Sequence, residues 1–132
     1  MNTFSAEVGA GTRYHIRALA HFCGEDLCVS ICGGEREHIG AVSLAVYEPE
    51  RDSATVSTLT VFTHRDDRVS RRAAKFFSRA LRCTVCVSAG LHIDAPGDGE
   101  LETLLENCDE CCAVLVRALK KAQAPILQGP IP

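Results

Sequence analysis

Residues 12–22 alternate between apolar and polar side chains, and this period of two is the feature that most constrains the fold. The apolar members fall on one side of an extended chain, and they are Tyr14, Ile16, Ala18, Ala20 and Phe22. Successive side chains of a strand point to opposite faces, whereas a helix would scatter these residues around its axis. The segment therefore predicts a half-buried strand with one face on a core and one face in water.

Three further strands are predicted at residues 26–32, 38–47 and 54–62. Each is rich in β-branched or other apolar residues, and glycine, proline and charged residues separate one strand from the next. The Gly33–Gly34 pair ends the first of these three strands. The first half of the chain is thus expected to form an antiparallel meander.

The apolar period then changes from two to three and four, which is typical of amphipathic helices. A helix of about four turns is predicted to end near Leu81, with Thr63 and Asp66 forming a capping-box-like start. A strand over 83–93 and a second helix over 101–121 follow. The predicted order is therefore four strands, a helix, a strand and a helix.

This order predicts an α+β fold in which a single, mainly antiparallel sheet carries its helices on one face. The strand–helix–strand crossover should make its two strands parallel or near neighbours. Residues 12–122 are expected to form one domain, preceded by an N-terminal extension at 1–11 and followed by a proline-rich, mobile tail at 123–132. An open sheet edge on so small a domain also predicts a homodimer.

The charge and the hydropathy pattern argue against nucleic-acid and membrane partners. The net charge is −3, and the basic residues from Arg65 to Lys75 lie around a predicted helix, where a solvated face explains them. No apolar run approaches the roughly 20 residues of a membrane span, and the first residues lack the pattern of a signal peptide. The chain is therefore expected in the cytoplasm.

Eight cysteines raise the question of a zinc site, because Cys83/Cys86 and Cys108/Cys111 have C-x-x-C spacing. The first pair lies in a predicted strand, where this spacing places the two thiols on opposite faces. The second pair belongs to the apolar stripe of the last helix, together with Cys112. Free, structural thiols are therefore favoured over zinc ligands.

Polar residues gather where the predicted strands begin or end. His38 opens the third strand, His64 follows the fourth, and His92 and Asp94 end the fifth. The predicted topology allows these residues to meet at one sheet edge, together with Asp66 or Asp67. Histidine and carboxylate groups suit a polar ligand or a divalent metal, for which the candidate ligands are His38, His64, Asp67, His92 and Asp94. Ordinary loop histidines and a helix cap are the alternative explanation.

Other sites are not indicated by sequence motifs. The chain has no phosphate-binding P-loop, no dinucleotide fingerprint and no nucleophile elbow. The Gly33–Gly34 pair next to His38 can be explained either by a hairpin turn or by a backbone nest that binds an anion.

Three stretches resemble one known family. They are "GGEREHIGAVSLAV" at 33–46, "STLTVFTHRDD" from Ser57, and "CVSAGLHIDAPGDGELETLLENC" from Cys86. Together they resemble the LpdD-like family, the small proteins that accompany UbiD-type hydroxyaryl decarboxylases, over roughly residues 12–120. The resemblance implies a fold similar to proteasome assembly chaperones. It also implies ligand-side positions at His38, Ile39, Gly40, His64, Asp67, His92 and Asp94, beside which the glycine pair would contact a phosphate.

The same resemblance implies a non-catalytic prenylated flavin chaperone. Such a protein would bind prenylated flavin mononucleotide (FMN) and deliver it to a UbiD-type decarboxylase, or help that enzyme mature, with a flavin prenyltransferase as a second partner. Two alternatives remain: a small metal-dependent enzyme or accessory protein that uses the His/Asp site, and an assembly factor that binds only the decarboxylase.

Overall fold

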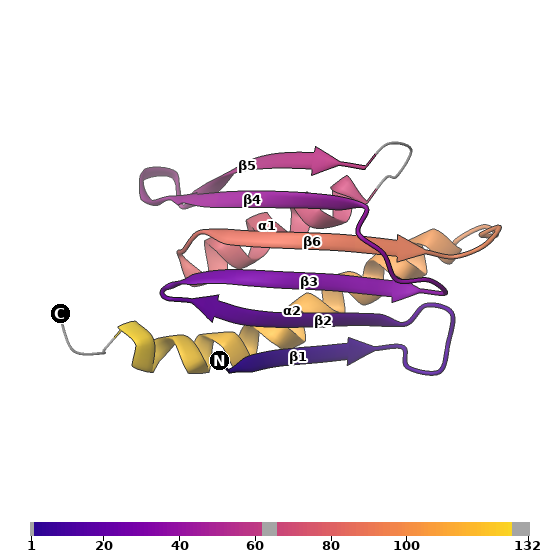
Figure 1. The fold of residues 1–132 in the computed structure, drawn as a ribbon, viewed down its shortest axis with the longest axis horizontal. Helices are drawn as coiled ribbons and strands as arrows, with labels where there is room; N and C mark the ends of the chain where they lie inside the picture. Colours follow the sequence, from indigo (N-terminus) through magenta and orange to yellow (C-terminus); the bar gives the residue numbers. More distant parts are fainter. Residues whose placement is uncertain (1, 62–65, 128–132) are drawn as a thin grey trace.

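The computed structural model describes residues 2–61 and 66–127, and its centre is one six-stranded sheet (Figure 1). The strand order across the sheet is β1-β2-β3-β6-β4-β5. The elements are β1 (Thr3–Val8), β2 (Ile16–Cys23), β3 (Asp26–Gly34), β4 (Ala41–Glu48), a 3-10 turn (Pro49–Arg51), β5 (Ser53–Thr60), α1 (Asp67–Leu81), β6 (Val85–His92) and α2 (Glu100–Leu127).

The sheet is mainly antiparallel, and the only parallel pair among its described strands is β3 with β6. Strand β4 lies between β5 and β6 and is antiparallel to both, so β5 and β6 run in the same direction one strand apart. The predicted crossover is therefore confirmed, with β4 inserted between its two strands.

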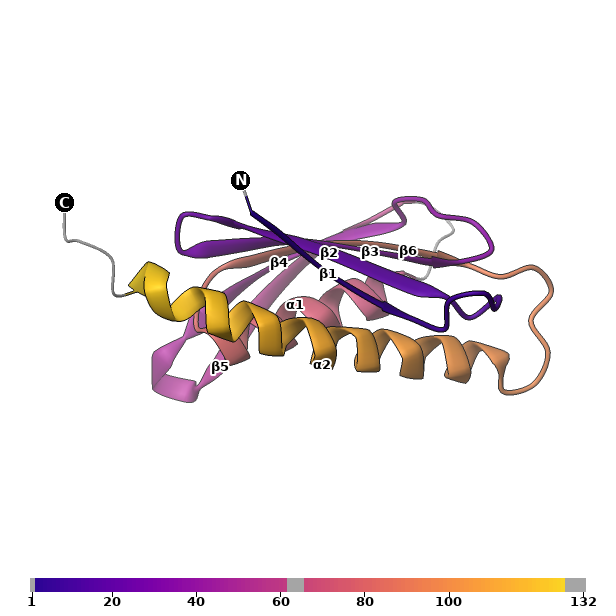
Figure 2. The same ribbon diagram turned by 90° about the horizontal axis from the view of Figure 1, so that it is seen from below.

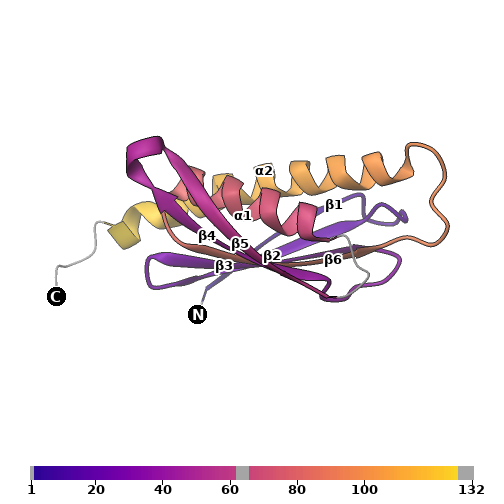
Figure 3. The same ribbon diagram turned by 90° about the horizontal axis from the view of Figure 1, so that it is seen from above.

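Both helices lie on one face of the sheet (Figures 2 and 3). Helix α1 packs on β4, β5 and β6, whereas α2 packs on β1 and β2 and also touches α1. The predicted α+β fold is thus confirmed. Alternate strand residues and the apolar stripes of the helices form the core, which includes Ile16, Ala18, Val29, Ile31, Phe77, Val85, Val87, Leu115 and Leu119.

The opposite face of the sheet carries no helix in the described part of the chain (Figure 2). The strand registers place six residues of this open face in one row: Ser5, Leu19, Ser30, Ser88, Val42 and Leu59. Small side chains occupy the central strands, and larger apolar ones flank them. Leu19 is 47% exposed and Leu59 is 80% exposed, so this apolar surface is open to solvent.

Strand β1 lies in the segment that was expected to be an N-terminal extension, where no strand was predicted. Phe4, Ala6 and Val8 alternate with polar residues, and Ala6 is buried in the core. The signal was the same period of two that identified β2, in a shorter segment. Antiparallel pairing with β2 makes β1 an edge strand of the sheet.

Both helices have ends that differ from the predicted ones. Helix α1 begins at Asp67, and the side chain of its N-cap residue Asp66 makes no capping hydrogen bond. Thr63, the other half of the predicted capping box, lies outside the described residues. Helix α2 continues to Leu127, six residues beyond its predicted end, so the segment 123–127 is helical. Gln123 anchors this extension by donating a 2.6 Å hydrogen bond from Nε2 to the carbonyl oxygen of Leu81.

The eight cysteines are free thiols, and their positions agree with the structural interpretation. Cys108, Cys111 and Cys112 are buried in the stripe of α2 that faces the sheet and α1. Burial raises the pKa of Cys111 to about 11 and that of Cys112 to about 12. In the part of the chain that the structure describes, no helix combines the length and the apolar character needed to cross a membrane.

Thiol reactivity tests this arrangement. In the native protein, we expect exposed Cys23 to react quickly with a chromogenic disulfide reagent, because reaction requires access and a thiolate. Cys108, Cys111 and Cys112 should react only after unfolding. Peptide mass mapping after a short labelling pulse would identify the modified residues, and rapid native labelling of Cys111 would contradict the packing of α2.

Candidate functional site

Several of the predicted polar residues lie together where the central strands end, and we call this end of the sheet the sheet edge. Strands β3, β5 and β6 end at this edge, and β4 begins there, because β4 is antiparallel to both β5 and β6. His38 precedes β4, Asp66 follows β5, and His92 ends β6. The structure therefore brings these residues to one edge as predicted, whereas His64 lies outside the described residues.

The carboxylate of Asp66 connects two segments at this edge. Its Oδ2 lies 3.0 Å from Nε2 of His38, and its Oδ1 accepts a 3.0 Å hydrogen bond from the backbone N–H of Leu91. Asp66 is only 6% exposed, so its charge is held in place by these partners rather than by bulk water. The pair fixes the His38 ring, which remains partly open to solvent.

His92 and Asp94 form a second pair. Nε2 of His92 lies 2.7 Å from Oδ1 of Asp94, and this hydrogen bond lowers the pKa of the Asp94 carboxyl. The exposed Asp94 contrasts with the buried Asp66. His38 and His92 are thus each oriented by a carboxylate of their own.

The arrangement does not support the predicted metal site. Within residues 2–61 and 66–127, no three His, Cys, Asp or Glu side chains gather with a spacing that could hold a metal ion. His38 and His92 are engaged in separate carboxylate pairs. Of the two carboxylates predicted to meet the histidines, Asp66 pairs with His38, whereas Asp67, the predicted metal ligand, is the first residue of α1.

Glycines permit the close packing of backbones at this edge. A Cβ on Gly90 would lie 1.7 Å from the carbonyl oxygen of His38, and one on Gly40 would lie 1.8 Å from Oδ2 of Asp66. Both distances are shorter than any real contact. The loop before β4 can therefore reach β6 and Asp66 only because residues 40 and 90 lack side chains.

The Gly33–Gly34 pair lies within β3 and not in a turn. The Gly34 N–H donates a 2.8 Å hydrogen bond to the carbonyl oxygen of His15, and the Glu35 N–H donates to that of His92. These two donors are used inside the sheet, so they do not form a nest for an anion here. A Cβ on Gly34 would lie 2.1 Å from the carbonyl oxygen of His92, which explains the glycine.

Exposed apolar side chains lie at the same edge. Ile39, next to His38, is 63% exposed, and Leu59 and Val61 near the end of β5 are also exposed. The backbone N–H of Val61 donates a 2.8 Å hydrogen bond to the carbonyl oxygen of Gly40, so these segments are neighbours. The edge thus combines an oriented imidazole with an apolar surface.

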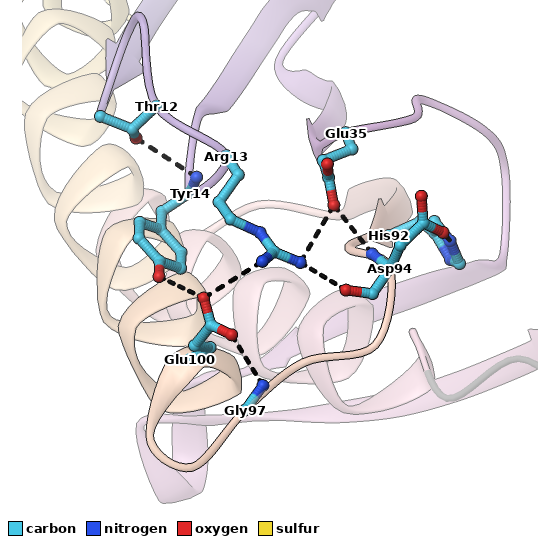
Figure 4. Close-up of polar contacts among 8 residues, drawn as sticks. All are labelled: Thr12, Arg13, Tyr14, Glu35, His92, Asp94, Gly97 and Glu100. Carbon is cyan, nitrogen blue, oxygen red and sulfur yellow. Dashed lines mark hydrogen bonds and ion pairs between the residues drawn. The ribbon is translucent and has the colours of Figure 1, made fainter.

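A polar network around Arg13 holds three loops of this edge together (Figure 4). The Arg13 guanidinium donates to Glu35 Oε1 at 3.1 Å and to the carbonyl oxygen of Asp94, and it lies 3.4 Å from Glu100 Oε2. The hydroxyl of Tyr14 also donates to Glu100, which lowers the pKa of that carboxyl. The loops after β1, β3 and β6 are thereby tied to the start of α2.

None of Arg13, Tyr14, Glu35 and Glu100 was predicted as a site residue. These residues are up to 87 positions apart and follow no motif, so only the fold brings them together. The strand alternation did place Arg13 outside the core, which is the one signal that was available.

Removing the Asp66 carboxylate tests the construction of this edge. We expect Asp66→Ala to lower the free energy of unfolding by about 1–3 kcal/mol, because the partly buried Leu91 N–H loses its acceptor and His38 loses its partner. Asp98→Ala, on an exposed loop at the same end, should change stability little. Urea denaturation of both variants measures the difference, and equal stabilities would contradict the role assigned to Asp66.

A family of known proteins matches most of the chain. The family described as the prenylated flavin chaperone LpdD-like domain matches residues 10–120. Protein LpdD of Lactiplantibacillus plantarum is 28% identical to this chain over 94 residues, which are 71% of this chain and 67% of that protein.

A solved structure shares the fold. A chain in the crystal structure of a novel chaperone complex for yeast 20S proteasome assembly superposes with a TM-score of 0.54 at 11% identity, covering 88% of this chain and 99% of that chain. This likeness confirms the predicted similarity of fold to proteasome assembly chaperones. The family match covers the whole sheet beyond β1 and most of α2. The chain belongs to the prenylated flavin chaperone LpdD-like family.

Proposed function

We propose that this chain is a non-catalytic chaperone that binds prenylated FMN and delivers it to a UbiD-type decarboxylase, or helps that enzyme mature. The family match over residues 10–120 is the observation that carries this proposal. A flavin prenyltransferase is the proposed source of the cofactor. The role requires the protein to hold the flavin and to release it, and no bond needs to be made or broken.

We place the flavin at the sheet edge, where the contacts would be His38, Ile39, Gly40, His64, His92 and Asp94, with Gly33 and Gly34 shaping the strand behind them. The oriented His38 ring supplies a hydrogen-bonding group, and the exposed Ile39 supplies apolar contact for a flavin ring.

His38→Ala tests this placement. The protein is coexpressed with a flavin prenyltransferase and purified without oxygen, and the bound flavin is measured by absorbance and by mass. We expect wild-type protein to retain prenylated FMN and His38→Ala to bind it roughly 10- to 100-fold more weakly, as expected for a lost hydrogen bond to a charged group. The melting temperature should change little, because the Asp66 carboxylate keeps its hydrogen bond from the Leu91 N–H and His38 itself is partly exposed.

His21→Ala is the matched control, since this histidine lies toward the opposite end of the sheet on β2. Wild-type affinity in the His38→Ala variant would remove this residue from the site. The assembly-factor alternative would instead be supported by two results together: the wild-type protein retains no flavin, and it binds apo-decarboxylase equally well with and without flavin.

We also propose that the protein is a homodimer that pairs through the open face of the sheet. The six strands have six to nine residues each. At about 3.3 Å per residue along a strand and about 4.8 Å between strands, the open face covers roughly 600 Å². This approaches the roughly 800 Å² per partner of a stable interface. The flanking leucines of one copy fit the small serines and cysteines at the centre of the other.

Leu44→Asp tests the dimer, because Leu44 is 46% exposed on the open face, where its register partners are Cys86 and Ser57. A buried charge at the interface should convert the dimer into a monomer with an unchanged circular dichroism spectrum. Light scattering after size exclusion measures the mass. Leu101→Asp changes a similarly exposed leucine, at the start of α2, and should leave the dimer intact. A monomeric wild type would contradict the proposal.

A further inference from the structure

A groove of about 730 Å³ lies on the helical side of the molecule. It is lined by α1, by the first half of α2 and by one residue of β5, and it contains none of the residues of the sheet-edge site. Half of its lining is apolar. Phe76 is 39% exposed in it, and Leu105 is partly exposed, so the apolar surface is accessible from solvent.

The two helices give the groove opposite charges. The α1 side carries Arg68, Arg71, Arg72 and Lys75, and the α2 side carries Glu102, Glu106 and Asp109. Within the described part of the chain, one ion pair links the two sides: Nε and Nη2 of Arg72 each lie 2.9 Å from a carboxylate oxygen of Asp109.

The remaining charges of the groove are not paired across it. Among the described residues, Arg68 and Lys75 on α1 and Glu102 and Glu106 on α2 form no ion pair. The groove thus has an apolar centre between a basic side on α1 and an acidic side on α2. Both sides carry charged groups that can pair with a bound partner. A matching partner would place an apolar surface on the centre of the groove, acidic groups next to α1 and basic groups next to α2.

We propose that this groove binds an amphipathic helix of another protein, with acidic side chains along one flank and basic side chains along the other. The acidic flank would face Arg68 and Lys75, and the basic flank would face Glu102 and Glu106. The apolar stripe would rest on Phe76 and its neighbours. This inference concerns a surface separate from the flavin site and does not rest on flavin binding.

The lining elements favour a helix over an extended peptide. The backbone groups of α1 and α2 are bonded within each helix, so they offer no free edge to an added strand. A helix satisfies its own backbone and needs only a groove. On α1 the lining runs from Arg68 to Phe76, a length of about 12 Å, which accommodates about two helical turns.

The charges of the groove also favour a helix of this kind over a flavin phosphate as the bound partner. A phosphate dianion near Arg68 would also lie in the field of Glu102, Glu106 and Asp109, which oppose its charge. A peptide helix avoids this conflict because its two flanks carry opposite signs.

The experiment uses the full chain and two designed helical peptides of about 18 residues, long enough to form helix. Both have the same leucine stripe. The mixed peptide has glutamates on one flank and lysines on the other, and the basic peptide has lysines on both. Fluorescence anisotropy of labelled peptide at low ionic strength measures the affinities. We expect wild-type protein to bind the mixed peptide about tenfold more tightly than the basic one.

The double variant Arg68→Glu/Lys75→Glu reverses two of the four charges on the α1 side of the groove and leaves Arg71 and Arg72 in place. We expect it to bind the mixed peptide about tenfold more weakly and to prefer the basic peptide. Arg117→Glu/Lys120→Glu is the matched control, because it makes the same change in net charge at exposed positions of α2 outside the groove. This control should keep the wild-type preference.

Several results would overturn the proposal. One is no preference for the mixed peptide in the wild type, and another is the same reversal of preference in the control variant. Displacement of the bound peptide by FMN would make the groove a flavin site. A lower oligomeric mass of Arg68→Glu/Lys75→Glu in light scattering would make a second copy of this chain the occupant.

Discussion

The hydrogen bond from the Leu91 N–H to the Asp66 carboxylate is the contact on which the candidate site depends. It joins the last turn before α1 to the end of β6, the strand that lies between β3 and β4. The same carboxylate orients His38 in the loop before β4. Three segments that are distant in the sequence therefore meet at one buried charge, and Gly40 and Gly90 provide the space that this meeting requires.

The fold separates three surfaces that differ in their chemistry. The sheet edge presents oriented histidines next to exposed apolar residues, the open face presents a broad apolar area, and the helical side presents a charged groove. The Arg13 network ties the loops at the edge to the start of α2. The proposed role, in which the protein receives a cofactor, holds it and passes it on, would use several such surfaces.

Much of the fold could be predicted from side-chain periodicity, because alternation and amphipathic spacing are local properties of the sequence. The same alternation is present in Phe4, Ala6 and Val8, in a segment that was expected to be an extension without a strand. Contacts across long separations could not be predicted in this way. The pairing of His38 with Asp66 spans 28 positions, and the choice of Asp66 over Asp67 depends on where α1 begins. The glycine pair illustrates the limit, since its residues serve strand packing, which neither the turn nor the nest interpretation anticipated.

The position of the flavin is the central claim, and backbone amide chemical shifts test it most directly. Isotope-labelled protein is titrated without oxygen with prenylated FMN made by a flavin prenyltransferase. We expect the largest shifts at the sheet edge, at His38, Ile39, Gly40, Leu91 and His92, while the signals of Lys75 and Leu105 in the helical groove stay unchanged. Large shifts confined to the groove, with none at the edge, would contradict it.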